Sequence, residues 1–198
     1  MTPEEWAGLA LVCALGAMSP GPSLAFVLRN TISGGRQRGL TTAIGHGIGI
    51  GLYAIAFIAV LSGILDSFPS IESALRWTGV ILLILFGTLM LKSKPSEKIE
   101  QDDALSDNAF FAGFSLAFFN PKIAAWMVAV YSQFVHLNSS FGTMIGMGVL
   151  AFGIDAGWYA LVAVFFGGSI AKNLQNKAQL IDRIVGSLLI FFGIYLAI

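Results

Sequence analysis

Two short proline-containing motifs interrupt apolar stretches of the chain and carry the residues best suited to binding chemistry. Met18 to Ser23 reads MSPGPS, inside a run from Trp6 to Leu28 that holds no Asp, Glu, Lys, Arg or His. A second apolar run is interrupted by the tripeptide NPK. Each proline removes a backbone donor and breaks a helix, which frees main-chain carbonyl and amide groups. The residues that we place at a binding site on this basis are Ser19, Pro20, Gly21, Pro22, Ser23, Asn120, Pro121 and Lys122.

Lys122 lies inside an apolar run, and a lysine at the bilayer centre costs about 2.5–3.5 kcal/mol. Its ammonium could neutralise carbonyls freed by the helix break, or bind a substrate carboxylate together with the amides of the second half-helix. Asn120 beside it offers a donor and an acceptor. The Ser19 and Ser23 hydroxyls suit an ammonium group, although a packed kink would use the same residues. We predict a binding site, because two interrupted segments in corresponding halves indicate the substrate site of a transporter.

Asp155 and His46 are the other ionisable side chains at membrane depth, and such residues are functional candidates. Burial disfavours a charged carboxylate whereas a nearby ammonium favours it, so Asp155 could hold a proton far from Lys122 and release it nearby. The hypothesis is that Asp155 carries a coupling proton, and that His46 assists or takes its place, since histidine titrates near neutral pH. The alternatives are an Asp155–Lys122 ion pair and a structural hydrogen bond at His46. Tyr53 and Tyr159 either line the same cavity or only pack.

The composition places these residues in an integral membrane protein. Of the 198 residues, 56% are hydrophobic and 11% are charged, against about 25% charged in a soluble domain, and the mean hydropathy is +0.80. At roughly 20 residues per span, the apolar stretches predict six transmembrane helices, the first broken at Pro20–Pro22 and the fourth at Pro121. Their approximate ranges are residues 5–28, 40–65, 71–91, 109–134, a part of 137–171, and 180–198.

Several classes of function find no support in the sequence. The formal net charge is zero, so nothing indicates nucleic-acid binding. The single cysteine, Cys13, and the two histidines, His46 and His136, form no metal-ligand motif, and no nucleophile–base pair or phosphate-binding loop is present. We therefore predict no metal, no cofactor and no enzymatic activity. The predicted partners are the lipid bilayer and a small-molecule substrate, and a homo-oligomer stays open.

Basic residues separate the loops into two sides. Nine Lys or Arg residues fall on one side of the six-span arrangement and Arg76 alone on the other. Because positive residues favour cytoplasmic loops, we predict that the nine lie inside the cell and that both termini lie outside. The nine are Arg29, Arg36, Arg38, Lys92, Lys94, Lys98, Lys172, Lys177 and Arg183.

A polar linker, 92–108, divides a single transporter domain, 1–198, into repeat one (1–91) and repeat two (109–198). Residues 47–54 (GIGIGLYA) resemble 153–160 (GIDAGWYA) at a constant offset of 106 positions, 76–79 (RWTG) resemble 183–186 (RIVG), and 22–25 (PSLA) resemble 121–124 (PKIA). Each half holds three spans, an odd number, so the copies must sit upside down relative to each other. The predicted fold is an all-α integral membrane protein with six transmembrane helices in two inverted three-helix repeats.

Glycines recur four residues apart within the predicted spans, at Gly45/Gly49, Gly47/Gly51, Gly142/Gly146 and Gly153/Gly157. On a membrane helix this spacing lets two backbones approach closely. We therefore predict tight helix packing at these positions.

The two broken motifs resemble those of the LysE/RhtB family of bacterial amino-acid exporters. Members of that family carry SPGP late in the first span, here Ser19 to Pro22, and NPK in the fourth, here Asn120 to Lys122. Chain length, span number and the charged central linker also fit, so the resemblance covers the whole chain; residues 131–134 (YSQF) depart from the Pro-Gln-Phe of many members. The resemblance implies efflux of an amino acid or derivative across the bacterial inner membrane, driven by the proton gradient. The resemblance does not indicate which amino acid is exported.

Other classes of function stay open on the residues alone. A passive pore or channel for small zwitterions could hold the same polar groups, although it needs no intramembrane acid and base together. A membrane-embedded enzyme or a non-catalytic assembly subunit is the third class, and an enzyme would need a convergent nucleophile or metal set. A secondary exporter accounts for both broken spans and both intramembrane charges.

Overall fold

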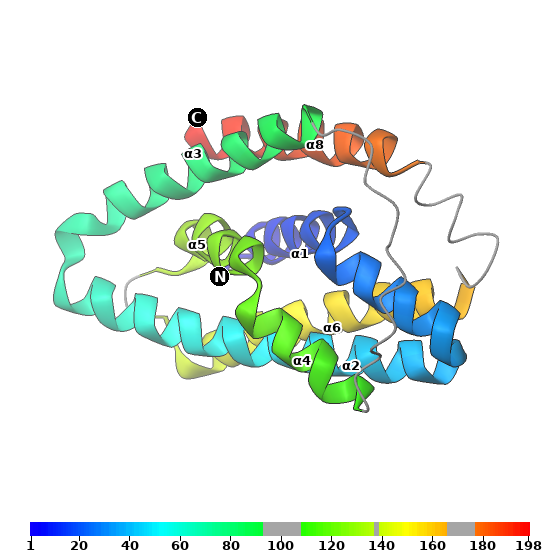
Figure 1. Ribbon diagram of the computed structural model, residues 1–198. Coiled ribbons are helices and arrows are strands. Elements are labelled where there is room, and N and C mark those ends of the chain that lie inside the picture. The colour runs from blue at the N-terminus through cyan, green and yellow to red at the C-terminus, as the bar shows by residue number, and fades with distance from the viewer. Residues whose placement is uncertain (93–107, 137–138, 166–176) are drawn as a thin grey trace.

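The computed structural model describes residues 1–92, 108–136, 139–165 and 177–198, and within these ranges all regular secondary structure is helical (Figure 1). This confirms the predicted all-α fold. The interior of the predicted polar linker, 93–107, lies outside the described residues. The elements are α1 (Pro3–Met18), α2 (Pro22–Ser67), a short 3-10 helix η1 (Pro69–Ile71), α3 (Glu72–Leu91), α4 (Ala109–Phe119), α5 (Pro121–Phe134), α6 (Phe141–Phe165) and α8 (Ala178–Ala197).

Within the described residues, four stretches of helix are long and apolar enough to cross a membrane on their own: α2, η1 with α3, α6, and α8. Helices α4 and α5 add a fifth span when they are counted together, because they form one path bent by 59° at the NPK motif. These candidate spans agree with the prediction of a multi-pass helical membrane protein. Helix α1 has 16 residues, which is too short to cross a bilayer unaided, so the count of six spans stays a prediction.

Helix α2 is too long to be one membrane span. Its 46 residues would extend about 69 Å at 1.5 Å per residue, more than twice the roughly 30 Å hydrocarbon core. It is interrupted at Gly35, where φ is 78° and ψ is 173°, a conformation that glycine adopts without the steric cost of a side chain. Arg29, Arg36 and Arg38, which the sequence placed in a loop, therefore lie on helical turns on either side of Gly35.

The helices pack in layers that Figure 1 shows from the side. Helices α3 and α8 lie against each other, α2 packs on α6 and α4, and α1 and α5 lie between these groups. Close approach of α3 and α8 depends on Gly87 and Gly186, since a Cβ added to either would lie 2.6 Å from the carbonyl oxygen of the other. Gly47 is similarly close to Ala156, with 2.6 Å between an added Cβ and the alanine Cβ.

The predicted glycine packing is confirmed for Gly45/Gly49, which pack on α4, and for Gly47/Gly51, and it is wrong for Gly153/Gly157. Gly47 and Gly51 both face helix α6 at close range. Gly153 and Gly157, which occupy the corresponding positions of the second half, have no described atom within 4 Å of an added Cβ. Spacing alone therefore does not identify which face of a helix is packed, because all of these pairs have the same spacing.

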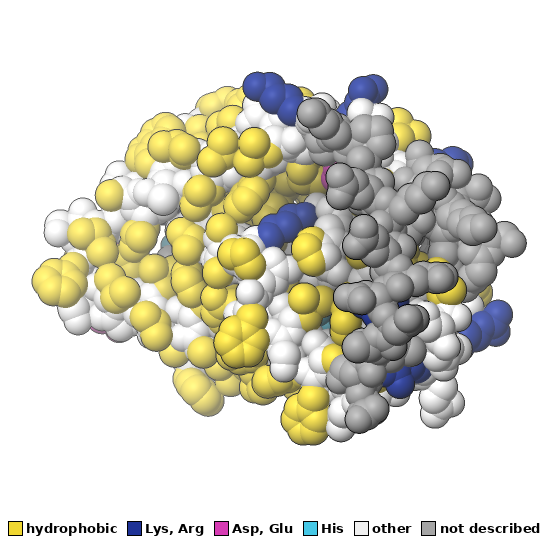
Figure 2. Space-filling view, viewed as in Figure 1, with side chains coloured by type: hydrophobic (Ala, Val, Ile, Leu, Met, Phe, Trp, Pro, Cys, Tyr) yellow, Lys and Arg dark blue, Asp and Glu magenta, His cyan; other side chains and the backbone are white. Residues whose placement is uncertain are grey.

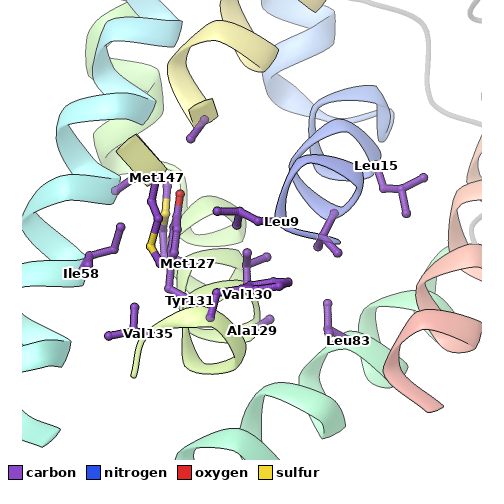
Figure 3. Packing of buried hydrophobic residues seen from close by; sticks show 14 of the residues in the cluster. Leu9, Leu15, Ile58, Leu83, Met127, Ala129, Val130, Tyr131, Val135 and Met147 are labelled. Atoms are coloured by element: carbon purple, nitrogen blue, oxygen red, sulfur yellow. The ribbon is translucent and has the colours of Figure 1, made fainter. Parts of the chain in front are cut away.

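The buried core is apolar and draws on most helices. Figure 3 shows Leu9 of α1 near Val130 of α5, with Leu15 farther along α1 and Leu83 on α3. Many large apolar side chains are also exposed on the outer surface, and Figure 2 shows hydrophobic side chains covering much of one face. An apolar exterior around a packed core is what a bilayer requires of a helical protein.

The described Lys and Arg side chains gather toward one end of the molecule. The last turn of α3, with Lys92, packs beside the first turns of α8, and Gly39 of α2 lies beside Ala163 of α6. Both places fall in the same half of Figure 1, where Figure 2 shows most of the dark blue side chains. At the opposite end, Glu5 Oε1 and His136 Nε2 lie 2.8 Å apart. We refer to these as the basic end and the opposite end.

Candidate functional site

The two helix breaks meet inside the protein although they are about a hundred positions apart in sequence. The Lys122 ammonium donates to Ser19 Oγ at 2.6 Å and to the carbonyl oxygen of Pro20 at 3.4 Å. Asn120 Nδ2 donates to Ser23 Oγ at 3.5 Å. Polar groups of one break therefore satisfy polar groups of the other, which lets both breaks persist in an apolar surrounding.

Each break follows from local sequence. Pro22 and Pro121 occupy the first turns of α2 and α5, where a missing N–H costs nothing. Asn120 caps α5, because its Oδ1 accepts from the Lys122 amide at 3.0 Å. Gly21 at the start of α2 provides no side-chain cap, so the first amides of α2 stay available to a ligand. A Cβ at Gly21 would lie 3.2 Å from Lys122 Nζ, so glycine leaves room beside the ammonium.

A buried histidine and a buried carboxylate form the second part of the site. His46 Nδ1 lies 2.7 Å from Asp155 Oδ2, and His46 Nε2 lies 2.9 Å from Ser23 Oγ. His46 is 1% exposed and Asp155 is 6% exposed. The Tyr159 ring packs edge-on against the imidazole, with 5.1 Å between ring centroids. Asp155 thus pairs with His46 rather than with Lys122, and His46 joins the carboxylate to the first helix break.

A cavity of about 70 Å³ lies between these groups, which by volume has room for roughly five water molecules. Most of the predicted site residues line it, namely Ser19, Gly21, Pro22, Ser23, His46, Asn120, Lys122, Asp155 and Tyr159. Pro20 contributes its carbonyl to Lys122, and Pro121 begins α5 without lining the cavity. Tyr53 also lies outside the lining and stacks on Phe118, with 5.3 Å between ring centroids.

The remaining wall of the cavity consists of residues that the sequence reasoning missed. Helix α5 supplies five of these ten residues, and Cys13 of α1 also lines this wall. The signal was present, because residues three, four and seven positions apart share a helix face, and Lys122 could have been projected along α5 to Trp126. The additional lining residues are Cys13, Gly16, Ala17, Ile50, Ile123, Trp126, Met127, Val130, Tyr131 and Ala151.

Tyr131 stands out on this wall because its hydroxyl has no hydrogen-bond partner among the described residues. The side chain is 2% exposed, so bulk water does not reach it freely. A buried hydroxyl without a partner is unfavourable by about 1–3 kcal/mol. A ligand that brought a donor or acceptor to this position would remove that cost.

The cavity therefore has a polar wall with opposite charges and a mostly apolar wall with one hydroxyl. The polar wall offers an ammonium, a carboxylate and a helix start that favours anions. Within the described residues, no group of three or more His, Cys, Asp or Glu side chains could hold a metal ion. The arrangement suits a small zwitterion whose side chain points toward the apolar wall.

Comparison with known proteins gives a consistent result. Residues 14–198 match the family described as LysE type translocator. The chain is 27% identical to the threonine efflux protein of Escherichia coli K12 over 96% of each chain. It is 24% identical to the leucine efflux protein of Klebsiella pneumoniae, over 90% of this chain and 87% of the relative. No solved structure matches the chain at a significant level.

Proposed function

The chain belongs to the LysE type translocator family, as its motifs predicted, and from that premise we propose that it is a proton-driven secondary exporter of a free amino acid across the bacterial inner membrane. Family membership makes it an amino-acid efflux transporter of the membrane rather than an enzyme. The observation that carries the finer proposal is the meeting of both helix breaks at one buried cavity that also holds the His46–Asp155 pair.

Lys122 is the group that binds the substrate carboxylate. An ammonium has three N–H donors, and Ser19 Oγ and the Pro20 carbonyl engage two of them, so one donor is left for a ligand. The uncapped start of α2 at Gly21 lies beside the same ammonium. Its free amides and the positive end of the helix dipole add to the attraction for an anion.

The substrate ammonium is bound on the other side of the break. Helix α1 ends at Met18, and the last carbonyls of a helix have no partner within it. Asp155 engages His46 through Oδ2, and a carboxylate has a second oxygen that can accept from an ammonium. The site thus places hydrogen-bond acceptors at one side and the Lys122 donor at the other, as a zwitterion requires.

His46 links the proton to the substrate through the Ser23 hydroxyl. When the imidazole is neutral and donates from Nδ1 to Asp155, Nε2 is an acceptor and Ser23 donates to it. When the imidazole is protonated, both nitrogens donate, so Ser23 Oγ must accept and its own proton turns toward the cavity. Protonation therefore reverses the direction of a hydrogen bond in the wall of the substrate site, without moving any helix.

Two inverted repeats provide the frame for alternating access. We take α1 with the first part of α2 as one broken span and α4 with α5 as its counterpart, with Gly35 between spans one and two. The arrangement is supported by α3 packing on α8 and α2 on α6, which are corresponding spans of the two halves. The described basic residues at one end support a cytoplasmic basic end with both termini outside.

Substitution of Lys122 tests the substrate site. Lys122→Met keeps an unbranched stem but removes the ammonium, so labelled threonine should no longer accumulate in inside-out vesicles with an acidic interior. The matched control is Lys92→Met, an exposed lysine at the end of α3, which should transport normally. Normal affinity in Lys122→Met would refute the carboxylate role, and equilibration without accumulation by the unmodified chain would indicate a passive pore.

Substitution of the buried pair tests the proton role. Asp155→Asn and His46→Gln keep hydrogen-bonding capacity but remove a titratable group, so both should lose accumulation driven by a proton gradient while still exchanging labelled for unlabelled threonine. The control is His136→Gln, because His136 also pairs with a carboxylate, Glu5, but outside the cavity. If only one variant loses driven accumulation, that residue carries the proton; if neither does, the pair is structural.

A further inference from the structure

A second cavity lies at the opposite end of the molecule from the basic residues. Its volume is about 450 Å³, and it shares no lining residue with the central cavity. The start of α3, the end of α5 and the end of α8 enclose it. We call it the outer groove, and its polar lining consists of Glu72, Ser73, Arg76 and Gln133, with Trp77 beside them.

Gln133 lines the outer groove and carries a buried acceptor atom. The side chain is 5% exposed, and Nε2 donates to the main-chain carbonyl of Arg76 at 2.6 Å and to Ser132 Oγ at 3.4 Å. These contacts fix the amide orientation, because the reverse would set Oε1 against the Arg76 carbonyl oxygen. Oε1 is left without a hydrogen-bond partner among the described residues. A buried acceptor of this kind favours a ligand that brings a donor.

Two opposite charges line the same groove. Glu72 and Arg76 are four residues apart on α3, which places them on one face of the helix. Among the residues that the structure describes, neither side chain forms an ion pair, either with the other or with a third group. The groove therefore offers one cationic donor group, the guanidinium. It also offers two acceptors, the carboxylate and the unpaired amide oxygen.

From these groups we propose that the outer groove is a second binding site for a zwitterion, namely the free amino acid after it leaves the central cavity. The Arg76 guanidinium binds the carboxylate, as guanidinium groups do through paired N–H donors. The Glu72 carboxylate and Gln133 Oε1 bind the ammonium. The identity of the ligand as an amino acid rests on the proposed function, whereas its zwitterionic character rests on the groove. A lipid head group with a phosphate and an ammonium would offer the same chemistry.

The position of the groove fits a site reached on the way out. Helix α5 carries Lys122 at its start and Gln133 near its end, about 16 Å apart at 1.5 Å per residue. The two cavities thus lie along one helix, one at the break and one at the opposite end. Arg76 has a counterpart in the second half, Arg183, but the position that corresponds to Gln133 is Gly34. The set of groups that forms the groove is therefore specific to this end.

The experiment counts binding sites on the purified full-length chain in a non-ionic detergent. Equilibrium dialysis with labelled threonine should give two sites per chain. Arg76→Gln should reduce the number to one, Lys122→Met should also reduce it to one, and the double variant should bind none. Arg183→Gln is the matched control, because Arg183 is exposed at the corresponding repeat position and lies outside the groove, and it should keep both sites.

Each substitution should remove binding at one site and leave the other site unchanged. The test therefore separates the proposal of a second site from the proposed function. A single site that is lost in Lys122→Met and unchanged in Arg76→Gln would overturn the groove and leave Arg76 and Trp77 as interfacial anchors. Loss of all binding in Arg76→Gln would overturn it as well, since the groove would then not be a separate site. Absence of the Lys122-dependent site alone would refute the central site instead.

A second arm identifies the source of the zwitterion. The same titration is repeated in nanodiscs of phosphatidylglycerol and of phosphatidylethanolamine. Retention of the Arg76-dependent threonine site in both supports the free amino acid as the ligand. Loss of that site only in phosphatidylethanolamine supports the zwitterionic groove with the lipid head group as occupant.

Discussion

The unpaired hydroxyl of Tyr131 leads to a prediction about substrate choice. It lies on the mostly apolar wall of the central cavity, 2% exposed and without a hydrogen-bond partner among the described residues. Threonine and valine have the same shape but differ by a hydroxyl in place of a methyl group. A threonine side chain that pairs with Tyr131 removes an unsatisfied group, whereas valine leaves it buried and unpaired. We therefore expect this chain to prefer threonine over valine.

The size of this preference follows from the cost of the unpaired group. A buried polar group without a partner is unfavourable by about 1–3 kcal/mol, which corresponds to a roughly 5- to 150-fold difference in affinity. Tyr131→Phe keeps the ring and removes the hydroxyl, so the ratio of the affinity for threonine to the affinity for valine should fall toward one. Because the lost group has no partner, the variant should also be no less stable, with an unchanged or higher thermal midpoint.

Competition in inside-out vesicles measures the effect. Labelled threonine uptake is titrated with unlabelled threonine and unlabelled valine, and the ratio of their inhibition constants is compared between the unmodified chain and Tyr131→Phe. Tyr53→Phe is the control, since Tyr53 stacks on Phe118 outside the cavity and its loss should leave the ratio unchanged. An unaltered ratio in Tyr131→Phe would refute the reasoning, and so would a clearly lowered thermal midpoint.

Three other predictions concern packing, capping and orientation. Gly47→Ala should destabilise the purified protein by about 1–3 kcal/mol through overpacking against Ala156. Gly153→Ala should not lower the thermal midpoint, because an added Cβ there has nothing within 4 Å. Equal effects of the two substitutions would contradict this packing. Asn120→Ala should cost about 0.5–2 kcal/mol of stability by removing the α5 cap, and Asn120→Asp should restore thermal stability if capping is the cause. A reporter that works only in the cytoplasm, fused after Ile198, should be silent, and an active fusion would reverse the proposed orientation.

Sequence reasoning succeeded where the cause of structure is local. Proline removes a donor and fixes φ wherever it occurs, so the ends of α1 and α4 and the starts of α2 and α5 could be placed within about two residues. The predicted span at 71–91 agrees with η1 and α3 for the same reason, since Pro69 lies just before it. The sequence predicted a loop between residues 28 and 40, whereas in the structure this stretch is helical except at Gly35, a single non-helical residue that carries the turn.

Sequence reasoning failed where the result depends on how one helix is rotated against another. The repeat aligned Asp155 with Gly49, and charge alone suggested Lys122 as its partner. In the structure, close packing of Gly47 on Ala156 brings the adjoining residues, His46 and Asp155, side by side. For the same reason, the sequence could not show that the Tyr131 hydroxyl is unpaired. Whether a buried polar group has a hydrogen-bond partner depends on all of its neighbours in the folded protein.

The proposed duplication explains why these partners matter. Offsets of 99 and 106 positions make Ser23 the counterpart of Lys122 and Phe152 the counterpart of His46, so the halves supply unlike groups to one site. The Lys122–Ser19, Asn120–Ser23 and Asp155–His46 contacts all join repeat two to repeat one, whereas His46–Ser23 lies within repeat one.

In the proposed alternating-access mechanism, movement of one repeat against the other would break the contacts of the ammonium and the carboxylate together. It leaves the His46–Ser23 hydrogen bond intact, because both residues move with repeat one. A buried Asp155 separated from His46 loses its cationic or donor partner and favours the protonated form. Bound substrate offers an ammonium to Asp155 and a carboxylate to Lys122 in place of their partners. In the proposed mechanism, proton and substrate compete for the same separated groups, which is the condition for exchanging one for the other across the membrane.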